Sequence, residues 1–98
     1  MTPAPDSVQL EAARPDQIQV MLIDDQPIVG EAVRRMLSDD SDITVEPILD
    51  PLKALDQIKE SLPTVLIVDL VMPGIDGLEL TSIIRQEPVT RDIPVIIL

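Results

Sequence analysis

Three aspartates directly follow apolar runs that have the composition of buried strands. Asp24 and Asp25 come after residues 20–23, and Asp69 comes after residues 65–68. Ligands of open α/β sheets bind beyond the carboxyl ends of the strands, so neighbouring strands would bring these three carboxylates into one crevice. Like charges that close together favour the uptake of a cation. Oxygen ligands suit a hard ion, and Mg²⁺ is the common choice where a phosphate supplies further ligands.

Asp69 is also a candidate nucleophile. A carboxylate can attack phosphorus and form an acyl phosphate, while a metal ion neutralises the charge of the transferred group. Asp24 and Asp25 lie on the first loop and would serve as metal ligands. Two simpler interpretations remain open at this point. The Asp24-Asp25 pair could cap a helix that starts at Pro27, and Asp69 alone could be a solvated turn residue.

The composition excludes other classes of site. The chain has 98 residues with no His and no Cys, so it cannot form disulfides, imidazole or thiolate metal sites, or a catalytic triad. Its 18 acidic and 7 basic residues give a formal net charge of −11, which disfavours binding to nucleic acid or to anionic membranes. No apolar stretch approaches the roughly 18 residues of a membrane span, and we expect a cytoplasmic protein.

Short apolar runs predict the strands that position the aspartates. They lie at residues 20–23, 44–45, 65–68 and 95–98. Most of them are continuously apolar, which is typical of parallel strands covered on both faces, whereas the weaker run at 44–45 predicts an edge strand.

Three segments with helical spacing separate these strands. They begin at Pro27, at Asp50-Pro51 and at Asp76-Gly77, and the last two end near Pro63 and Pro88. The apolar positions expected to face inward are Ile28, Val29, Ala32, Val33, Met36 and Leu37 in the first, Leu52, Leu55, Ile58 and Leu62 in the second, and Leu80, Ile83 and Ile84 in the third. Alternating strands and helices predict an α/β fold with a parallel sheet and right-handed crossovers.

Both ends of the chain stand apart from this pattern. Residues 1–16 contain three prolines and no periodicity, which predicts a flexible leader. The chain stops at Leu98, at the end of a strand that should be central, where an apolar sheet edge would be uncovered. We therefore expect residues 17–98 to be the N-terminal part of a domain that is incomplete at its C-terminal end.

The loop after Asp69 contains two glycines and a proline, which predict a tight, rigid turn. Asp76 is interpreted as a helix cap rather than a ligand, and Met72 as a packing residue. Together with Asp24-Asp25, the loop forms a pattern that resembles the receiver domain of bacterial two-component response regulators. Its second motif reads Asp69-x-x-Met72-Pro73-Gly74-x-Asp76-Gly77.

The resemblance covers residues 18–98 and implies a flavodoxin-like, doubly wound parallel sheet of order 2-1-3-4-5, of which this chain holds the first four strands and three helices. It implies that Asp69 accepts a phosphoryl group from a histidine kinase or phosphotransfer protein. Asp25 and Asp69 would bind Mg²⁺ directly and Asp24 through water, and the backbone carbonyl of Val71 would complete the protein ligands. A Ser or Thr, an aromatic and a Lys of the family's switch would fall beyond Leu98.

The resemblance also bears on output and partners. Residues 30–35 and 90–94 are similar to receivers of Wsp-type regulators, whose output is a GGDEF diguanylate cyclase. By itself the chain would be a switch that phosphorylates itself rather than an enzyme, joined to an output domain in the same parent chain, and a homodimer is compatible with the family.

Two alternatives stay open. One is a pseudo-receiver, a protein-interaction module that is not phosphorylated. The other is an aspartate-nucleophile phosphohydrolase, which is disfavoured because Val71 stands where such enzymes usually have a second Asp.

Overall fold

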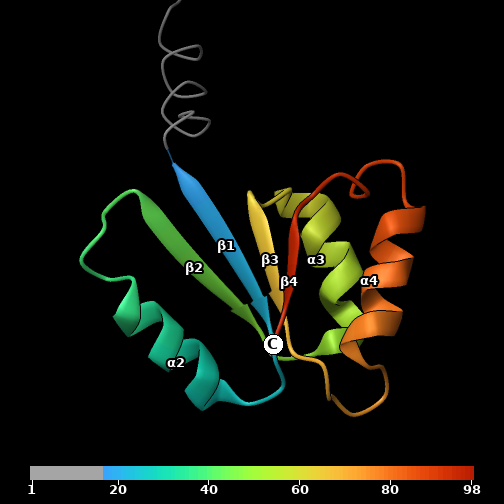
Figure 1. Cartoon of the computed structure of the whole chain (residues 1–98), viewed down its shortest axis with the longest axis horizontal. Helices are drawn as coiled ribbons and strands as arrows, with labels where there is room; N and C mark the ends of the chain where they lie inside the picture. The colour runs from blue at the N-terminus through green and yellow to red at the C-terminus, as the bar shows by residue number, and fades with distance from the viewer. Residues whose placement is uncertain (1–16) are drawn as a thin grey trace, which may run out of the picture.

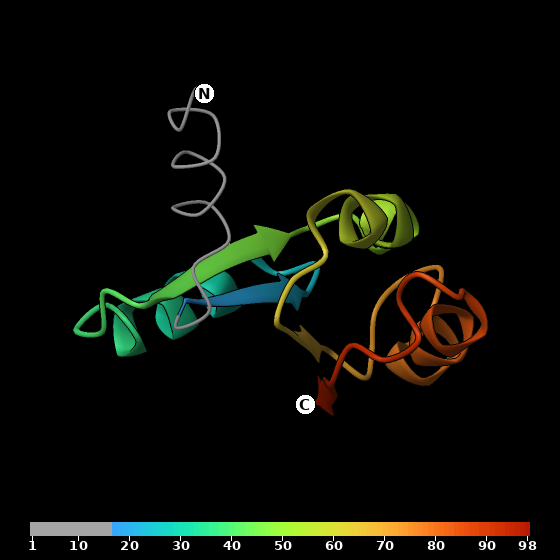
Figure 2. The ribbon, with the colours of Figure 1, turned by 90° about the horizontal axis from the view of Figure 1, so that it is seen from above.

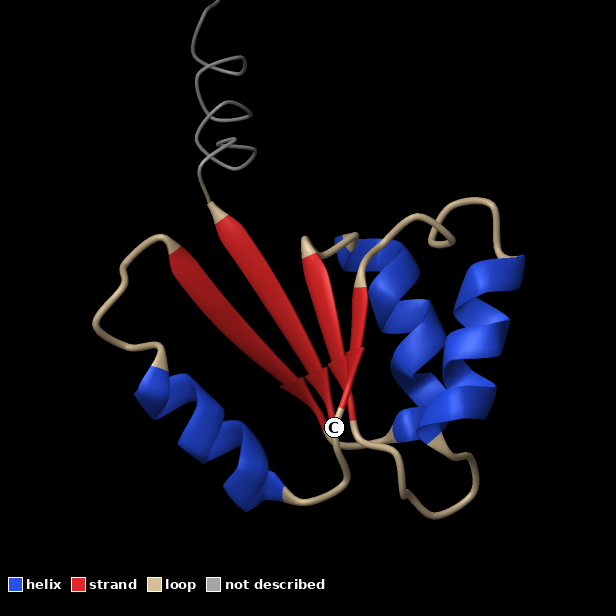
Figure 3. Cartoon of the chain, in the orientation of Figure 1, coloured by secondary structure: helices blue, strands red, loops and turns tan. Residues whose placement is uncertain are grey.

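Residues 17–98 are described in the computed structural model of the chain, and the leader predicted for residues 1–16 lies outside the described residues. Strands and helices alternate along the chain (Figures 1 and 3). The elements are β1 (Ile18–Ile23), α2 (Pro27–Met36), β2 (Ile43–Ile48), the 3-10 turn η1 (Pro51–Lys53), α3 (Ala54–Ser61), β3 (Val65–Val68), α4 (Gly77–Gln86) and β4 (Val95–Ile97).

The strands form one parallel sheet of order β2-β1-β3-β4. This confirms the predicted fold class and places the weak strand β2 at an edge. Ile23, the last residue of β1, pairs with Ile48 of β2 and with Val68 of β3. Three strands therefore end at the same level, and their arrowheads meet at one end of the sheet in Figure 1.

Pro47 lies within β2 without breaking the sheet. The amides of Ile18 and Asp24 donate to the carbonyls of Asp42 and Ile48, so even-numbered residues of β2 face β1. The nitrogen of Pro47 therefore points to the free edge, where its missing N–H removes no hydrogen bond of the ladder. Proline is found at such positions of edge strands.

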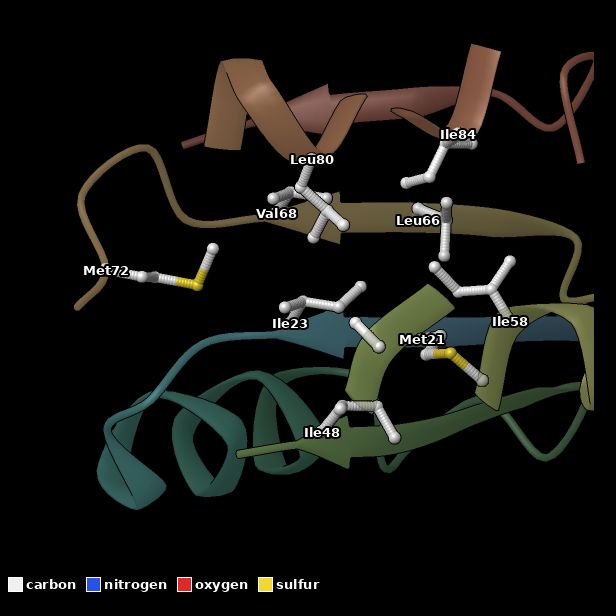
Figure 4. Packing of buried hydrophobic residues seen from close by; sticks show 10 residues of the cluster. Met21, Ile23, Ile48, Ile58, Leu66, Val68, Met72, Leu80 and Ile84 are labelled. Carbon is white, nitrogen blue, oxygen red and sulfur yellow. The ribbon is translucent and has the colours of Figure 1, made fainter. Parts of the chain in front are cut away.

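Helices cover both faces of the sheet (Figure 2). On one face, α3 and α4 pack their buried residues Ile58, Leu80 and Ile84 against the strands. Figure 4 shows this aliphatic cluster, to which β1 and β3 contribute alternate residues such as Met21 and Leu66. On the other face, α2 packs close to β2.

The helices bury fewer of their apolar residues than their spacing predicts. In α2, Ile28 and Met36 are 74% and 73% exposed, because Gly30 rather than either of them is buried against the sheet. Ala32 of α2 is exposed as well, and the corresponding errors in the other two helical segments are Leu52, Leu62 and Ile83. Apolar periodicity alone overestimates the buried face where a close helix–sheet contact uses a small residue.

Candidate metal site

The predicted aspartates converge at the carboxyl end of the sheet. One carboxylate oxygen from each of Asp24, Asp25 and Asp69 lies within 4.8 Å of the others. The main chain fixes this arrangement, because the amide of Asp69 donates to the carbonyl of Ile23 over 2.9 Å. The amide of Asp24 donates to the carbonyl of Ile48 over 3.1 Å. Strand β3, which precedes Asp69, and strand β1, which precedes the aspartate pair, are thus neighbours.

Asp24 is the most buried member of the cluster, with 5% of its surface exposed. Burial raises the pKa of its carboxyl group; the hydrogen bond from the amide of Gln26 opposes the rise, and the charges of Asp69 and Asp25 add to it. That bond joins the Gln26 amide to Asp24 Oδ1 over 2.9 Å. Asp24 therefore closes a turn before α2, while Gln26, the cap residue itself, gives the helix no side-chain cap.

The three carboxylates fit a hard cation. Among residues 17–98, no Lys or Arg forms an ion pair with Asp24, Asp25 or Asp69. Asp25 and Asp69 are only half-buried, so a ligand from solvent can reach both. A donor set made only of oxygens at this spacing suits Mg²⁺, Ca²⁺ or Mn²⁺ rather than a softer metal.

The loop between β3 and α4 holds Asp69 at the rim of this cluster. Met72 is buried against the core, and Gly74 adopts a φ of 88°, a conformation that favours glycine. Asp76 begins α4 in a capping box: its carboxylate accepts from the amide of Glu79 over 2.8 Å, and the Glu79 side chain accepts from the Asp76 amide. Asp76 is a cap, as predicted, and lies outside the metal cluster.

Val71 lies on the same loop, two residues after Asp69, with 77% of its surface exposed. The role of its carbonyl as a metal ligand stays a prediction. Gly77 was interpreted from the sequence as a turn residue only, and the structure places it directly against the backbone of Asp69. No signal in the sequence indicates this contact, because it depends on how α4 packs against the loop.

A family model for the response regulator receiver domain matches residues 20–98. The chain belongs to this family. The family identification agrees with the sheet order and with the place of the aspartate cluster at the carboxyl edge.

Individual proteins are similar to this receiver domain over most of its length. Response regulator Rre1 of Synechocystis sp. is 31% identical over 83 residues, which cover 85% of this chain and 36% of the relative. A protein-glutamate methylesterase/protein-glutamine glutaminase of Methanospirillum hungatei is 39% identical over 75 residues, which cover 76% of this chain and 21% of the relative. The matched part of this chain therefore covers at most 36% of the length of these two relatives.

The structure of the receiver domain is also similar to solved ones. The N-terminal domain of a response regulator receiver protein from Methanoculleus marisnigri superposes with a TM-score of 0.76 at 25% identity, covering 82% of this chain and 64% of the other. Within residues 17–98 of the receiver domain, no helix has the length and hydropathy that a membrane crossing requires.

Proposed function

We propose that this receiver domain accepts a phosphoryl group on Asp69 in a Mg²⁺-dependent reaction, with a histidine kinase or a phosphotransfer protein as the donor. The observation that carries the proposal is the meeting of three carboxylates within 4.8 Å at the carboxyl edge of the sheet. Phosphoryl transfer onto a carboxylate and dependence on Mg²⁺ are general properties of the family to which the chain belongs.

In the proposed reaction, a carboxylate oxygen of Asp69 attacks the phosphorus of a phosphohistidine. The new O–P bond forms as the P–N bond breaks, and the electron pair of that bond leaves with the imidazole nitrogen, which takes its proton from solvent. Asp69 suits this role better than Asp24, which is 5% exposed and accepts the Gln26 amide. Mg²⁺ held by these carboxylates would neutralise charge on the phosphoryl oxygens.

Asp25 and Asp69 are the direct metal ligands in this proposal, and the Val71 carbonyl completes them. Asp24 would act through a water molecule, in keeping with its burial and with its bond to the Gln26 amide. Two or three carboxylates and a carbonyl leave several positions to water, so we expect weak binding of Mg²⁺.

By itself the domain is proposed to be a phosphorylated switch rather than an enzyme. The alternative is a pseudo-receiver that binds partners without being phosphorylated. The complete set of three aspartates favours the switch.

An output domain in the same parent chain, proposed to be a GGDEF diguanylate cyclase, would read the switch. The support is the similarity of residues 30–35 and 90–94 to such regulators. Other outputs occur among the relatives, since the one from Methanospirillum hungatei is named as a methylesterase. A cyclase assay of the intact protein with GTP tests this.

We place the domain in the cytoplasm, where ATP-dependent kinases act. We propose that it binds neither nucleic acid nor membranes directly, in keeping with its net charge of −11.

Metal titration of the intact protein, followed by NMR, tests the site. Asp25→Asn should weaken Mg²⁺ binding at least tenfold, because it removes a charged direct ligand. Asp76→Asn is the matched control, since it makes the same chemical change at a capping aspartate of the adjoining loop. Equal affinities of the two variants would refute the ligand assignment.

A further inference from the structure

We infer that Gly77 is a positioning residue for the acceptor aspartate. The lack of a side chain at this position lets α4 begin directly against the backbone of Asp69, and this contact sets where the Asp69 carboxylate lies relative to Asp24 and Asp25. The inference rests on the proposed function, because it concerns the geometry of the same metal and acceptor site.

The space around Gly77 is closed by backbone. A Cβ atom added there would lie 2.5 Å from the carbonyl oxygen of Asp69, 3.0 Å from the Cα of Leu70 and 3.1 Å from the carbonyl carbon of Asp69. Cβ atoms do not approach non-bonded heavy atoms as closely as 2.5 Å. Backbone atoms also cannot rotate out of the way as the end of a side chain can. Any residue with a side chain therefore shifts either Asp69 or the start of α4.

The start of α4 cannot simply retreat. The amide of Gly77 donates to the carbonyl of Leu70 over 2.8 Å, which ties the start of α4 to the loop. One turn further, Leu80 is 2% exposed and Ile84 is fully buried in the core. Moving the helix outward would break packing around both side chains, so part of the shift falls on Asp69.

Asp69 and the aspartate pair are held by different elements. The amide of Asp69 bonds Ile23 of β1 and its neighbours Val68 and Leu70 bond Leu98, while its own carbonyl is the group that contacts Gly77. Asp24 is tied to β2 through the carbonyl of Ile48. A shift at Gly77 consequently moves the acceptor relative to the pair. Mg²⁺ demands near-ideal octahedral geometry, so a small displacement of one ligand lowers affinity. Changes at residues that orient ligands typically lower metal affinity about 10- to 100-fold.

Gly30 offers a matched control within the same chain. A Cβ atom there would lie 3.0 Å from Cβ of Pro47, so Gly30→Ala also forces a tight contact. That contact joins α2 to β2 and involves no atom of Asp69. Gly30→Ala should therefore lower stability without changing the metal site.

The test is a Mn²⁺ titration of the intact protein followed by electron paramagnetic resonance, with Mg²⁺ competition, for wild type, Gly77→Ala and Gly30→Ala. Urea unfolding of each variant measures stability alongside. We expect Gly77→Ala to lower metal affinity about 10- to 100-fold and to change the spectrum of bound Mn²⁺, whereas Gly30→Ala keeps wild-type values.

Equal metal affinity in wild type and Gly77→Ala, or equal losses in the two alanine variants, would overturn the inference while leaving the proposed function intact. A wild-type protein that binds neither ion would instead defeat the proposed function. All samples contain sucrose, which favours the folded state. A Gly77→Ala protein that stays unfolded there also counts against the inference, because the role of Gly77 would then be structural.

Discussion

The amide of Asp69 donates a 2.9 Å hydrogen bond to the carbonyl of Ile23, the residue that immediately precedes the Asp24-Asp25 pair. This bond between adjacent parallel strands holds the backbone of Asp69 beside the pair, and the contact with Gly77 then sets where the Asp69 carboxylate lies. Both constraints act on backbone atoms of Asp69 and involve no contact of the aspartate side chains. Substitutions of the aspartates should accordingly change the chemistry of the site more than its backbone.

Asp24→Asn should stabilise the metal-free protein at pH 7 while weakening metal binding. Burial raises the pKa of Asp24 in the folded state above its value in the unfolded chain. Between these two pKa values the folded state binds more protons, so stability falls as pH rises through that window and stays lower above it. Asn removes this penalty and can still accept the Gln26 amide.

Thermal unfolding of the metal-free protein at neutral and at acid pH measures the effect. The gain in melting temperature for Asp24→Asn should be largest at pH 7 and shrink below the unfolded-state pKa, where wild-type Asp24 is protonated too. A lower melting temperature than wild type at pH 7 would show that the ionised carboxylate stabilises the fold.

Asp76→Ala should lower the free energy of unfolding by about 1 kcal/mol, the usual loss for a helix N-cap. Asp76→Asn should change it little, since asparagine caps equally well. Neither variant should alter metal affinity, because Asp76 lies outside the cluster. Urea unfolding together with a metal titration checks both statements, and a loss of metal affinity in Asp76→Asn would make Asp76 part of the site.

Ile84→Ala should lower the free energy of unfolding by about 2–5 kcal/mol, because it opens a cavity at a fully buried position. Ile28→Ala removes the same atoms from a side chain that is 74% exposed, and should change stability by only about 0.5 kcal/mol. Chemical denaturation of the two variants compares them directly. Similar losses in both variants would mean that Ile28 is buried, as the apolar spacing of α2 predicts.

The sequence was sufficient to predict the order of elements and the meeting of the aspartates. Continuous apolar runs followed by Asp24-Asp25 and by Asp69 carry this information, because parallel strands align their carboxyl ends. Asp76 was predictable as a cap because aspartate directly before a helix is a local signal, and the structure confirms a capping box there.

Features that depend on close approach between elements were not predictable. Gly77 looks like a turn residue until α4 is placed on the backbone of Asp69. Leu62 has helical spacing with Ile58, yet it ends α3 with a φ of 47° and is 51% exposed. The Gly77 contact joins segments whose relative placement the pattern of residue types does not encode, and Leu62 leaves the helix through a left-handed backbone conformation that leucine rarely adopts.

Mass spectrometry of the intact protein after incubation with a small phosphodonor tests the central claim most directly. With Mg²⁺ present, wild type should gain one phosphoryl group, and peptide mapping should place it on Asp69. The adduct should be absent from Asp69→Asn and strongly reduced when the metal is chelated. An adduct of equal yield in Asp69→Asn, or one that forms equally well without divalent metal, would contradict the assignment of Asp69 as the metal-assisted acceptor.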